Sequence, residues 1–202
     1  MGQEVMCTAR WGAKIVRGKA LLEASEIIFR CDGRLKIPFS SIRELSAAEG
    51  ELRVKSGDRW VVFELGDRAE KWREKIANPK SVLEKLGLKS GQGVSVFGEL
   101  QADFLEKLQQ QRCAVRRGNM AKDVGWIFLG VAKRKELNQV KAIAGKMPAT
   151  AALWVVYPKG QTSITESDVI RAGRNAGLKD VKVVGFSAAQ TALKFVFPVG
   201  RR

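Results

Sequence analysis

Cationic side chains stand in three short groups in the second half of the chain, and they offer its clearest chemistry. These groups are Arg116-Arg117, Lys133-Arg134 and Lys159. Arginine can make two parallel hydrogen bonds to a phosphate or a carboxylate, and lysine acts as a compact positive charge. The residue types therefore predict recognition of an anionic ligand.

The residues that most enzymes use for proton transfer or metal binding are scarce. The chain has no histidine, which excludes a Ser-His-Asp or Cys-His nucleophile system and any His-ligated metal. Cys7, Cys31 and Cys113 lie far apart with no C-x-x-C pair, so we interpret them as free thiols in a reducing compartment. No acidic cluster has metal-ligand spacing. We predict no catalytic residue and no metal site, and the interpretation leans against an enzyme.

The formal net charge of +15 over 202 residues is unevenly distributed. Residues 1–78 hold 15 Lys and Arg against 12 Asp and Glu, and residues 79–202 hold 21 against 9. Such a field attracts phosphates, nucleic acid or an anionic membrane, although it can also serve solubility alone. The sequence starts with no signal-peptide pattern, and its longest apolar run, 151–157, is too short to span a membrane. We expect a cytoplasmic protein.

Turn signals punctuate the first part of the chain, up to Asn78-Pro79. Alternating segments on either side of Asp-Gly and Ser-Gly-Asp turns predict hairpins over 25–39 and 51–65. A helix is predicted to follow, capped by Asp67, with Trp72 and neighbouring apolar residues on one face. We predict an α+β module over residues 1–78, with a small antiparallel β-sheet and a C-terminal helix.

This order of elements resembles the pleckstrin-homology-like architecture. The resemblance implies a module that contacts lipid headgroups or a protein, and Lys14, Arg17 and Lys19 stand where a basic headgroup loop could lie. The alternative for these three residues is a solvated strand face.

Apolar strands and amphipathic helices alternate after Pro79. Strands are predicted at 94–97, 112–116, 125–131 and 152–157, and the runs 181–186 and 191–197 are joined by a connection too short for a crossover helix. These last two strands must pair antiparallel. We predict that residues 79–202 form a Rossmann-like α/β domain with a mostly parallel sheet and an antiparallel last strand.

The cationic groups are expected to come together because they follow successive strands of this sheet. In open α/β sheets, ligands bind at the carboxyl ends of the strands. The predicted ligand-binding residues are Gly98, Arg116, Arg117, Lys133, Arg134 and Lys159. The alternative for each cation is that it merely ends a strand in water.

The closing antiparallel hairpin is similar to that of the class I methyltransferase fold. The resemblance implies a glycine-rich loop after the first strand and an acidic residue after the second, which together hold S-adenosylmethionine. Here the loop offers Gly98 followed by Glu99, and Arg116-Arg117 stand in the place of the acidic residue. Both departures weigh against methyl transfer.

A second resemblance is to a bacterial family of unknown function. It rests on segments such as Lys85-Leu86-Gly87-Leu88-Lys89, Ala152-Leu153-Trp154-Val155 with Tyr157-Pro158-Lys159, and Ala192-Leu193-Lys194. The resemblance covers nearly all of the second domain. It implies a fold relative and names no activity.

The leading hypothesis from the sequence is a non-catalytic binding or regulatory protein. Its basic domain would hold a nucleotide, a phosphate or a nucleic-acid backbone without a cofactor, and its front module would contact a lipid surface or a protein partner. The alternative is a divergent methyltransferase-like enzyme that uses S-adenosylmethionine.

Overall fold

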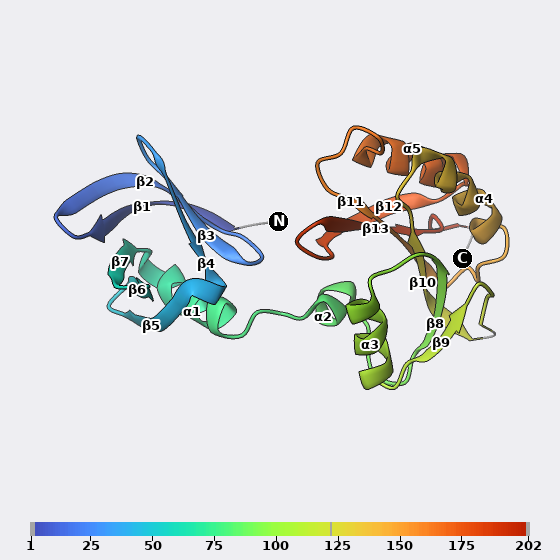
Figure 1. Ribbon diagram of the computed structural model, residues 1–202, viewed down its shortest axis with the longest axis horizontal. Coiled ribbons are helices and arrows are strands. Elements are labelled where there is room, and N and C mark those ends of the chain that lie inside the picture. The colour runs from blue at the N-terminus through green and yellow to red at the C-terminus, as the bar shows by residue number, and fades with distance from the viewer. Residues whose placement is uncertain (1–2, 122, 201–202) are drawn as a thin grey trace. The chain divides into compact units, whose positions relative to one another are not determined.

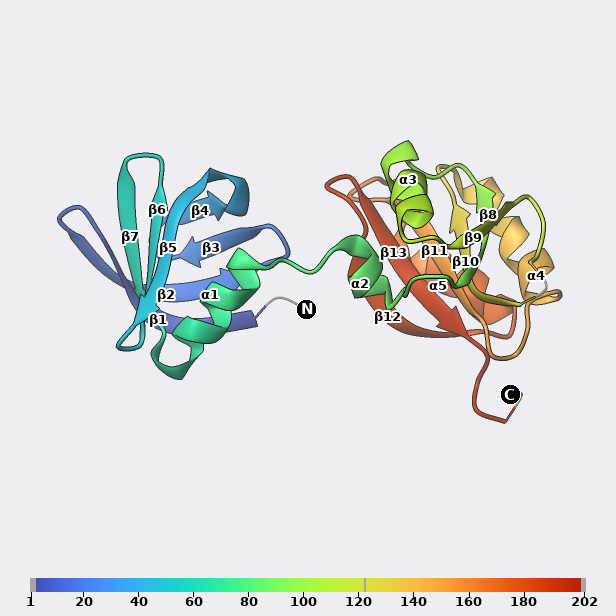
Figure 2. The ribbon, with the colours of Figure 1, turned by 90° about the horizontal axis from the view of Figure 1, so that it is seen from below.

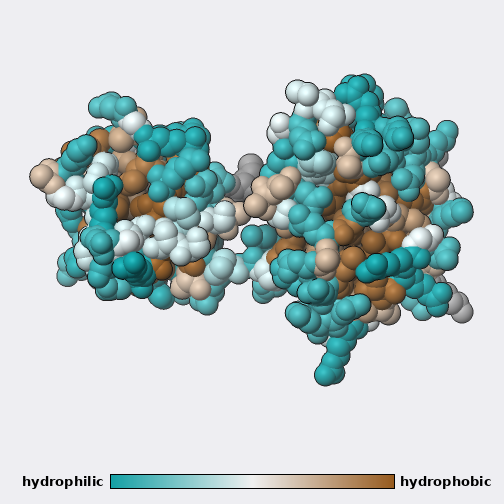
Figure 3. All heavy atoms as spheres, in the orientation of Figure 1, coloured by the Kyte–Doolittle hydropathy of each residue, from teal (hydrophilic) through white to brown (hydrophobic). Residues whose placement is uncertain are grey.

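The computed structural model describes residues 3–121 and 123–200 of the chain. It divides into two compact units, Met1–Lys80 and Ser81–Arg202, each with its own sheet (Figure 1). On the face that Figure 3 shows, hydrophilic residues cover most of each unit, and hydrophobic residues are visible between them. Within the described residues, no helix is long and apolar enough to cross a membrane.

The first unit is built on one curled antiparallel sheet of seven strands. The strands are β1 (Gln3–Trp11), β2 (Lys14–Leu22), β3 (Glu26–Arg30), β4 (Arg34–Pro38), β5 (Ile42–Ala48), β6 (Glu51–Ser56) and β7 (Arg59–Glu64). Their spatial order is β4-β3-β2-β1-β7-β6-β5. The two predicted hairpins are β3–β4 and β6–β7. Pro38 lies at the end of the edge strand β4, where its missing N–H costs no ladder hydrogen bond.

A helix closes the core of this unit. The 3₁₀ turns η1 (Phe39–Ser41) and η2 (Gly66–Arg68) precede β5 and α1 (Ala69–Ala77), and α1 packs on β5 and β6. Trp72 is fully buried and Ile76 is nearly so, as the helical spacing predicted. The predicted cap by Asp67 is wrong, because Asp67 lies inside η2 and α1 begins after Arg68 with no side-chain cap.

The second unit contains a six-stranded mixed sheet. Its strands are β8 (Gly93–Gly98), β9 (Ala114–Arg117), β10 (Val124–Gly130), β11 (Ala152–Pro158), β12 (Lys179–Gly185) and β13 (Gln190–Val196), in the spatial order β12-β13-β11-β10-β8-β9. Strands β8 to β11 run parallel, and β13 is antiparallel to both of its neighbours. The mostly parallel sheet with an antiparallel last strand is confirmed.

Helices cover both faces of this sheet (Figure 2). They are α2 (Val82–Leu86), α3 (Ala102–Gln110), η3 (Arg134–Asn138), α4 (Gln139–Ala144) and α5 (Glu166–Asn175). Helices α2 and α3 pack on the face that holds Phe128 and Trp154, whereas α4 and α5 pack on the face that holds Leu129 and Val155. Strands β10 and β11 are apolar throughout because both faces are covered.

The connection between β9 and β10 departs from the predicted alternation of strands and helices. These two strands flank β8, and residues 118–121 and 123, which the structure describes between them, form no helix. Instead, Met120 and Ala121 pack against the core, and the backbone N–H of Ala121 donates to the buried Ser95 hydroxyl at 2.8 Å. A loop pinned by Ser95 therefore covers β8 where a crossover helix would be expected.

Candidate functional site

The carboxyl edge of the parallel strands contains one point where the strand order reverses. From β8 the chain passes to β9 on one side, then crosses to β10 on the other. Gly98 ends β8 with a φ of 65°, in the left-handed region that favours glycine. A Cβ on Gly98 would collide with the carbonyl oxygen of Gly130, the last residue of β10. The ends of β8 and β10 can therefore approach each other only because both residues are glycine.

The segment that leaves β8 lies over the end of β10. A Cβ on Gly130 would collide with the carbonyl oxygen of Glu99, and the Leu100 side chain would be 3.1 Å from it. Glu99 is exposed and brings a carboxylate to the reversal point. Gly130 was not among the residues predicted from the sequence. The sequence feature that could have identified Gly130 is the presence of a glycine at the end of a wholly apolar strand.

The two arginines that were predicted to follow the second strand of this domain lie within that strand, β9. Arg116 and Arg117 belong to the strand, which runs further than expected, and they stand opposite Ser95 and Val96 of β8. Successive residues of a strand point to opposite faces, so the two guanidinium groups do not converge. Both residues are exposed on the edge strand.

Two of the other predicted cations already have partners within the chain. The Lys159 ammonium donates to the carbonyl oxygen of Ser187 at 2.7 Å. Arg134 forms an ion pair of 2.9 Å with Asp168 at the start of α5. Lys133 is exposed, and its backbone N–H donates to Glu136 at 3.2 Å. The six predicted residues thus follow one edge of the sheet, but the structure does not gather them into one pocket.

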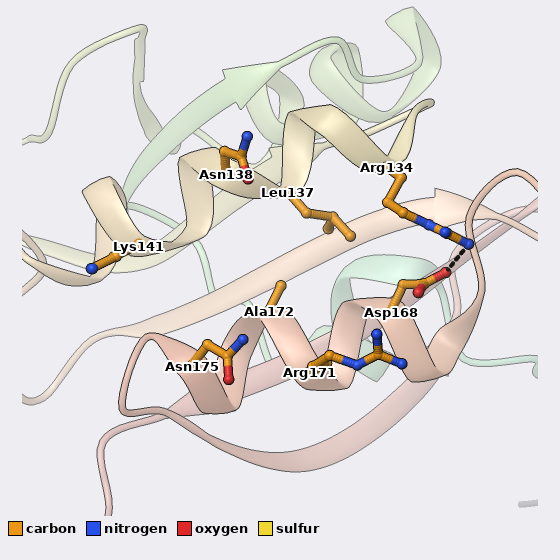
Figure 4. A pocket seen from close by; sticks show the side chains of 8 residues that line it. All are labelled: Arg134, Leu137, Asn138, Lys141, Asp168, Arg171, Ala172 and Asn175. Atoms are coloured by element: carbon orange, nitrogen blue, oxygen red, sulfur yellow. Dashed lines mark ion pairs between the residues drawn. The ribbon is translucent and has the colours of Figure 1, made fainter.

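A hollow of about 580 Å³ lies between η3–α4 and α5 (Figure 4). Leu137 and Ala172 lie between the helices, and the polar side chains stand around them. The lining residues are Arg134, Leu137, Asn138, Lys141, Asp168, Arg171, Ala172 and Asn175. Of the six predicted ligand-binding residues, Arg134 is the one that lines this hollow.

The acidic groups near the hollow stabilise the fold. Asp168 caps α5, and hydrogen bonds from Thr165, followed by the charge of Arg134, hold the pKa of its carboxyl below the usual range. Glu136 accepts hydrogen bonds from the backbone N–H groups of Ala132 and Lys133, which lower its pKa in the same way. Both carboxylates are therefore ionised and engaged at neutral pH.

The buried groups that could act as nucleophiles or acids are held in their neutral forms. Burial, followed by the nearby charge of Glu166, raises the pKa of Tyr157, whose hydroxyl donates to Glu166 at 3.1 Å. Burial also raises the pKa of the Cys7 thiol to about 11. Among the described residues, no group of three or more His, Cys, Asp or Glu side chains could hold a metal ion. The site can bind and orient a ligand by charge and hydrogen bonds.

Comparison with protein-family models gave no match, and comparison with curated proteins gave none. Solved structures do show similarity. A TehB-like SAM-dependent methyltransferase from Corynebacterium glutamicum has 11% identity and a TM-score of 0.38, with 65% of this chain and 97% of that chain covered. A SAM-dependent methyltransferase from Aquifex aeolicus has 16% identity and a TM-score of 0.41, with 56% and 86% covered.

An O-methyltransferase family 2 protein from Planctomyces limnophilus has 14% identity and a TM-score of 0.38 over 59% of this chain, which spans 52% of that protein. At these identities the likeness concerns the fold alone. Nevertheless, methyltransferases recur among these structures, so the prediction of a non-catalytic protein that holds an anion at this edge is wrong as the leading interpretation. Within the chain, Arg134 already pairs with Asp168, and Lys159 donates to the carbonyl oxygen of Ser187.

Proposed function

We propose that the second unit is a divergent methyltransferase-like enzyme that binds S-adenosylmethionine where the ends of β8 and β10 meet. The observation that carries this proposal is the strand order β9-β8-β10-β11-β13-β12, with its reversal at β8 and its antiparallel β13 between β11 and β12. Ligands of open α/β sheets bind at such a reversal, outside the carboxyl ends of the strands.

The residues at the reversal point fit this cofactor in part. Gly98 places no side chain at the end of β8, and the exposed Glu99 can accept hydrogen bonds from ribose hydroxyls or an amino group. Arg117 at the end of β9 cannot accept them, and Leu100 follows where a further glycine would leave more room. We therefore assign the role of ribose acceptor to Glu99 and none to the end of β9.

The chain contributes binding and orientation to the proposed reaction. When bound, S-adenosylmethionine supplies an electrophilic methyl group. The chain has no histidine, and Tyr157 is buried and neutral, so neither an imidazole nor a phenolate can act as general base here. The proposal therefore favours a substrate whose attacking atom needs little help with deprotonation, held in line with the methyl group.

Isothermal titration calorimetry of the full chain with S-adenosylmethionine and S-adenosylhomocysteine tests this proposal. We expect saturable binding in the micromolar range, and Glu99→Gln should weaken it by about tenfold because a charged acceptor is lost. Glu106→Gln on α3 removes the same charge from another exposed position and should leave binding unchanged. Absence of saturable binding up to roughly 1 mM would overturn the proposal.

We also propose an architecture for the first unit and domain boundaries for the chain. Seven antiparallel strands followed by the closing helix α1 support a pleckstrin-homology-like architecture for the first unit. Separate hydrophobic cores support two domains, 1–78 and 79–202. Of the predicted ligand-binding residues, the proposal uses Gly98. Direct contact of Arg116, Arg117, Lys133, Arg134 or Lys159 with a ligand stays a prediction.

A further inference from the structure

The hollow between η3–α4 and α5 is lined by two stripes of polar side chains, one from each side (Figure 4). Arg134, Asn138 and Lys141 come from η3 and α4, at the spacing that places residues on one side of a helix. Arg171 and Asn175 come from α5, again with helical spacing. Three of these side chains are cations, and the other two are amides that can donate and accept hydrogen bonds. Both sides of the hollow therefore present positive charge and hydrogen-bonding groups.

Two cations of the hollow, Lys141 and Arg171, are exposed and have no acidic partner. Within residues 3–121 and 123–200, neither forms an ion pair, whereas Arg134 pairs with Asp168. Each acidic residue of η3, α4 and α5 already accepts a hydrogen bond from within the chain. These acidic residues are Glu136, Glu166 and Asp168. The positive charge of Lys141 and Arg171 is therefore not compensated by the fold.

The surface around the hollow lacks the apolar groups that most partners of a basic surface use. Among the described residues, none of the large hydrophobic side chains that are exposed lies on η3, α4 or α5. A protein interface has an apolar core, and a bilayer surface takes apolar side chains at its acyl boundary. Single-stranded nucleic acid binds through aromatic side chains on which its bases stack. A duplex needs none of these groups, because its outer surface is a polar sugar–phosphate backbone.

We propose that the hollow between η3–α4 and α5 binds the sugar–phosphate backbone of a nucleic-acid duplex. Lys141 and Arg171 contact phosphates, since lysine acts as a point charge and arginine can make two parallel hydrogen bonds to one phosphate. Asn138 and Asn175 donate hydrogen bonds to neighbouring backbone oxygens. Contacts of this kind position a protein on a duplex without reading its sequence.

This surface is distinct from the two sites considered above. None of its four ligand-contacting residues was among those predicted to hold an anion at the carboxyl edge of the strands. None of them belongs to the reversal point at Gly98, Glu99 and Gly130. The proposal is therefore independent of the methyltransferase-like function, and the absence of S-adenosylmethionine binding would leave it standing.

Fluorescence anisotropy of the full chain with labelled DNA and RNA duplexes of about 20 base pairs tests the proposal. We expect binding of at least one duplex, without sequence preference, that weakens steeply between roughly 50 and 200 mM salt. Lys141→Gln combined with Arg171→Gln should weaken binding by about tenfold or more. The slope of log affinity against log salt should fall by about two, since two phosphate contacts are lost. The control, Lys80→Gln with Lys89→Gln on exposed positions either side of α2, changes the net charge equally and should weaken binding by less than about threefold.

A second pair of variants adds negative charge instead of removing positive charge. Asn138→Asp places a carboxylate at the hollow and should weaken duplex binding by about fivefold or more, because it repels phosphate. Gln109→Glu makes the same amide-to-carboxylate change on an exposed position of α3, on the other face of the sheet, and should leave binding nearly unchanged. All these variants should unfold at about the wild-type temperature, because every substituted side chain is exposed, so that lost binding is not lost folding.

Three results would overturn the proposal. The first is an equal loss of affinity in the Lys141 and Arg171 variant and in its control. The second is equal binding by Asn138→Asp and Gln109→Glu. The third is tighter binding of a poly-glutamate peptide or of single-stranded DNA than of either duplex, which would identify a different class of partner for this surface.

Discussion

The two sheets of this chain place their charged side chains in different ways. In the α/β unit, β10 and β11 are buried between two layers of helices, and charge is found where strands end, as at Arg134 and Lys159. In the curled sheet, one face surrounds the core, and charged side chains stand along the strands on the other face, as at Lys19, Arg30 and Arg34.

This difference indicates where each unit can act. A sheet covered on both faces can present chemistry only at its edge, and that edge is where Gly98, Glu99 and Gly130 meet. A sheet covered on one face can present a broad surface, which suits docking better than enclosure of a small ligand. Burial should therefore dominate the effect of substitutions in the α/β unit, and charge should dominate on the outer face of the curled sheet.

A pair of tryptophan substitutions gives the largest expected effect. Trp154 on β11 is fully buried, whereas Trp60 on β7 is 41% exposed with Lys55 above its ring. Trp154→Ala should cost about 3–5 kcal/mol of unfolding free energy because it leaves a cavity. Trp60→Ala should cost about 1–2 kcal/mol, since it loses less burial, together with one cation–π contact. Chemical denaturation, with hydrogen exchange to assign the loss to a unit, measures both. Equal losses would remove the contrast between the sheets.

Acid pH offers a second, smaller comparison. The pKa of Glu51 in the curled sheet is lowered by Arg53 and Arg10, and the pKa of Asp168 in the α/β unit is lowered by Thr165 and Arg134. A carboxyl whose pKa is lower in the folded state contributes stability that is present above its unfolded pKa. That contribution is lost as the pH falls through the folded pKa.

Both units should therefore lose stability as the pH falls below about 5. Glu51→Gln should flatten this dependence for the first unit alone, and Asp168→Asn for the second alone. Thermal unfolding followed at several pH values, with hydrogen exchange assigned to each unit, checks the result. A variant that kept the slope of the wild-type profile in its own unit would contradict the assignment.

The sequence predicted elements and their order better than the geometry of the site. Period-two and apolar runs located the hairpins β3–β4 and β6–β7, and the short connection before β13 required antiparallel pairing. These signals are local, so they can be read without the tertiary structure. The position of the loop between β9 and β10 could not be predicted, because it depends on a hydrogen bond from Ala121 to the buried Ser95, far away along the chain.

For the candidate site, the sequence predicted which edge of the sheet carries it but not which side chains meet there. Strand ends could be placed along the sequence, but side-chain partners such as Asp168 for Arg134 and the Ser187 carbonyl for Lys159 come from elements that only tertiary packing brings near. The contact between Gly98 and Gly130 depends on the register of two parallel strands, and the pattern of apolar residues along each strand does not determine that register. The position of Arg30 between Arg34 and Lys19 could not be predicted for the same reason, because only cross-strand register determines it.

The smallest expected effect is a gain in stability on the outer face of the curled sheet. Arg30→Glu would place an acid between Arg34 and Lys19, replacing two unfavourable cross-strand pairs with two favourable ones. We expect the unfolding free energy to rise by up to about 1 kcal/mol, since each exposed pair contributes a few tenths to about 1 kcal/mol. The matched substitution Arg53→Glu removes the ion pair with Glu51 and places two acids side by side, so it should instead lower the unfolding free energy. Denaturation at low and high salt measures both changes, which should shrink together as screening increases. A loss of stability in Arg30→Glu would mean that Arg30 is not repelled by Arg34 and Lys19, and the expected contrast with Arg53→Glu would no longer hold.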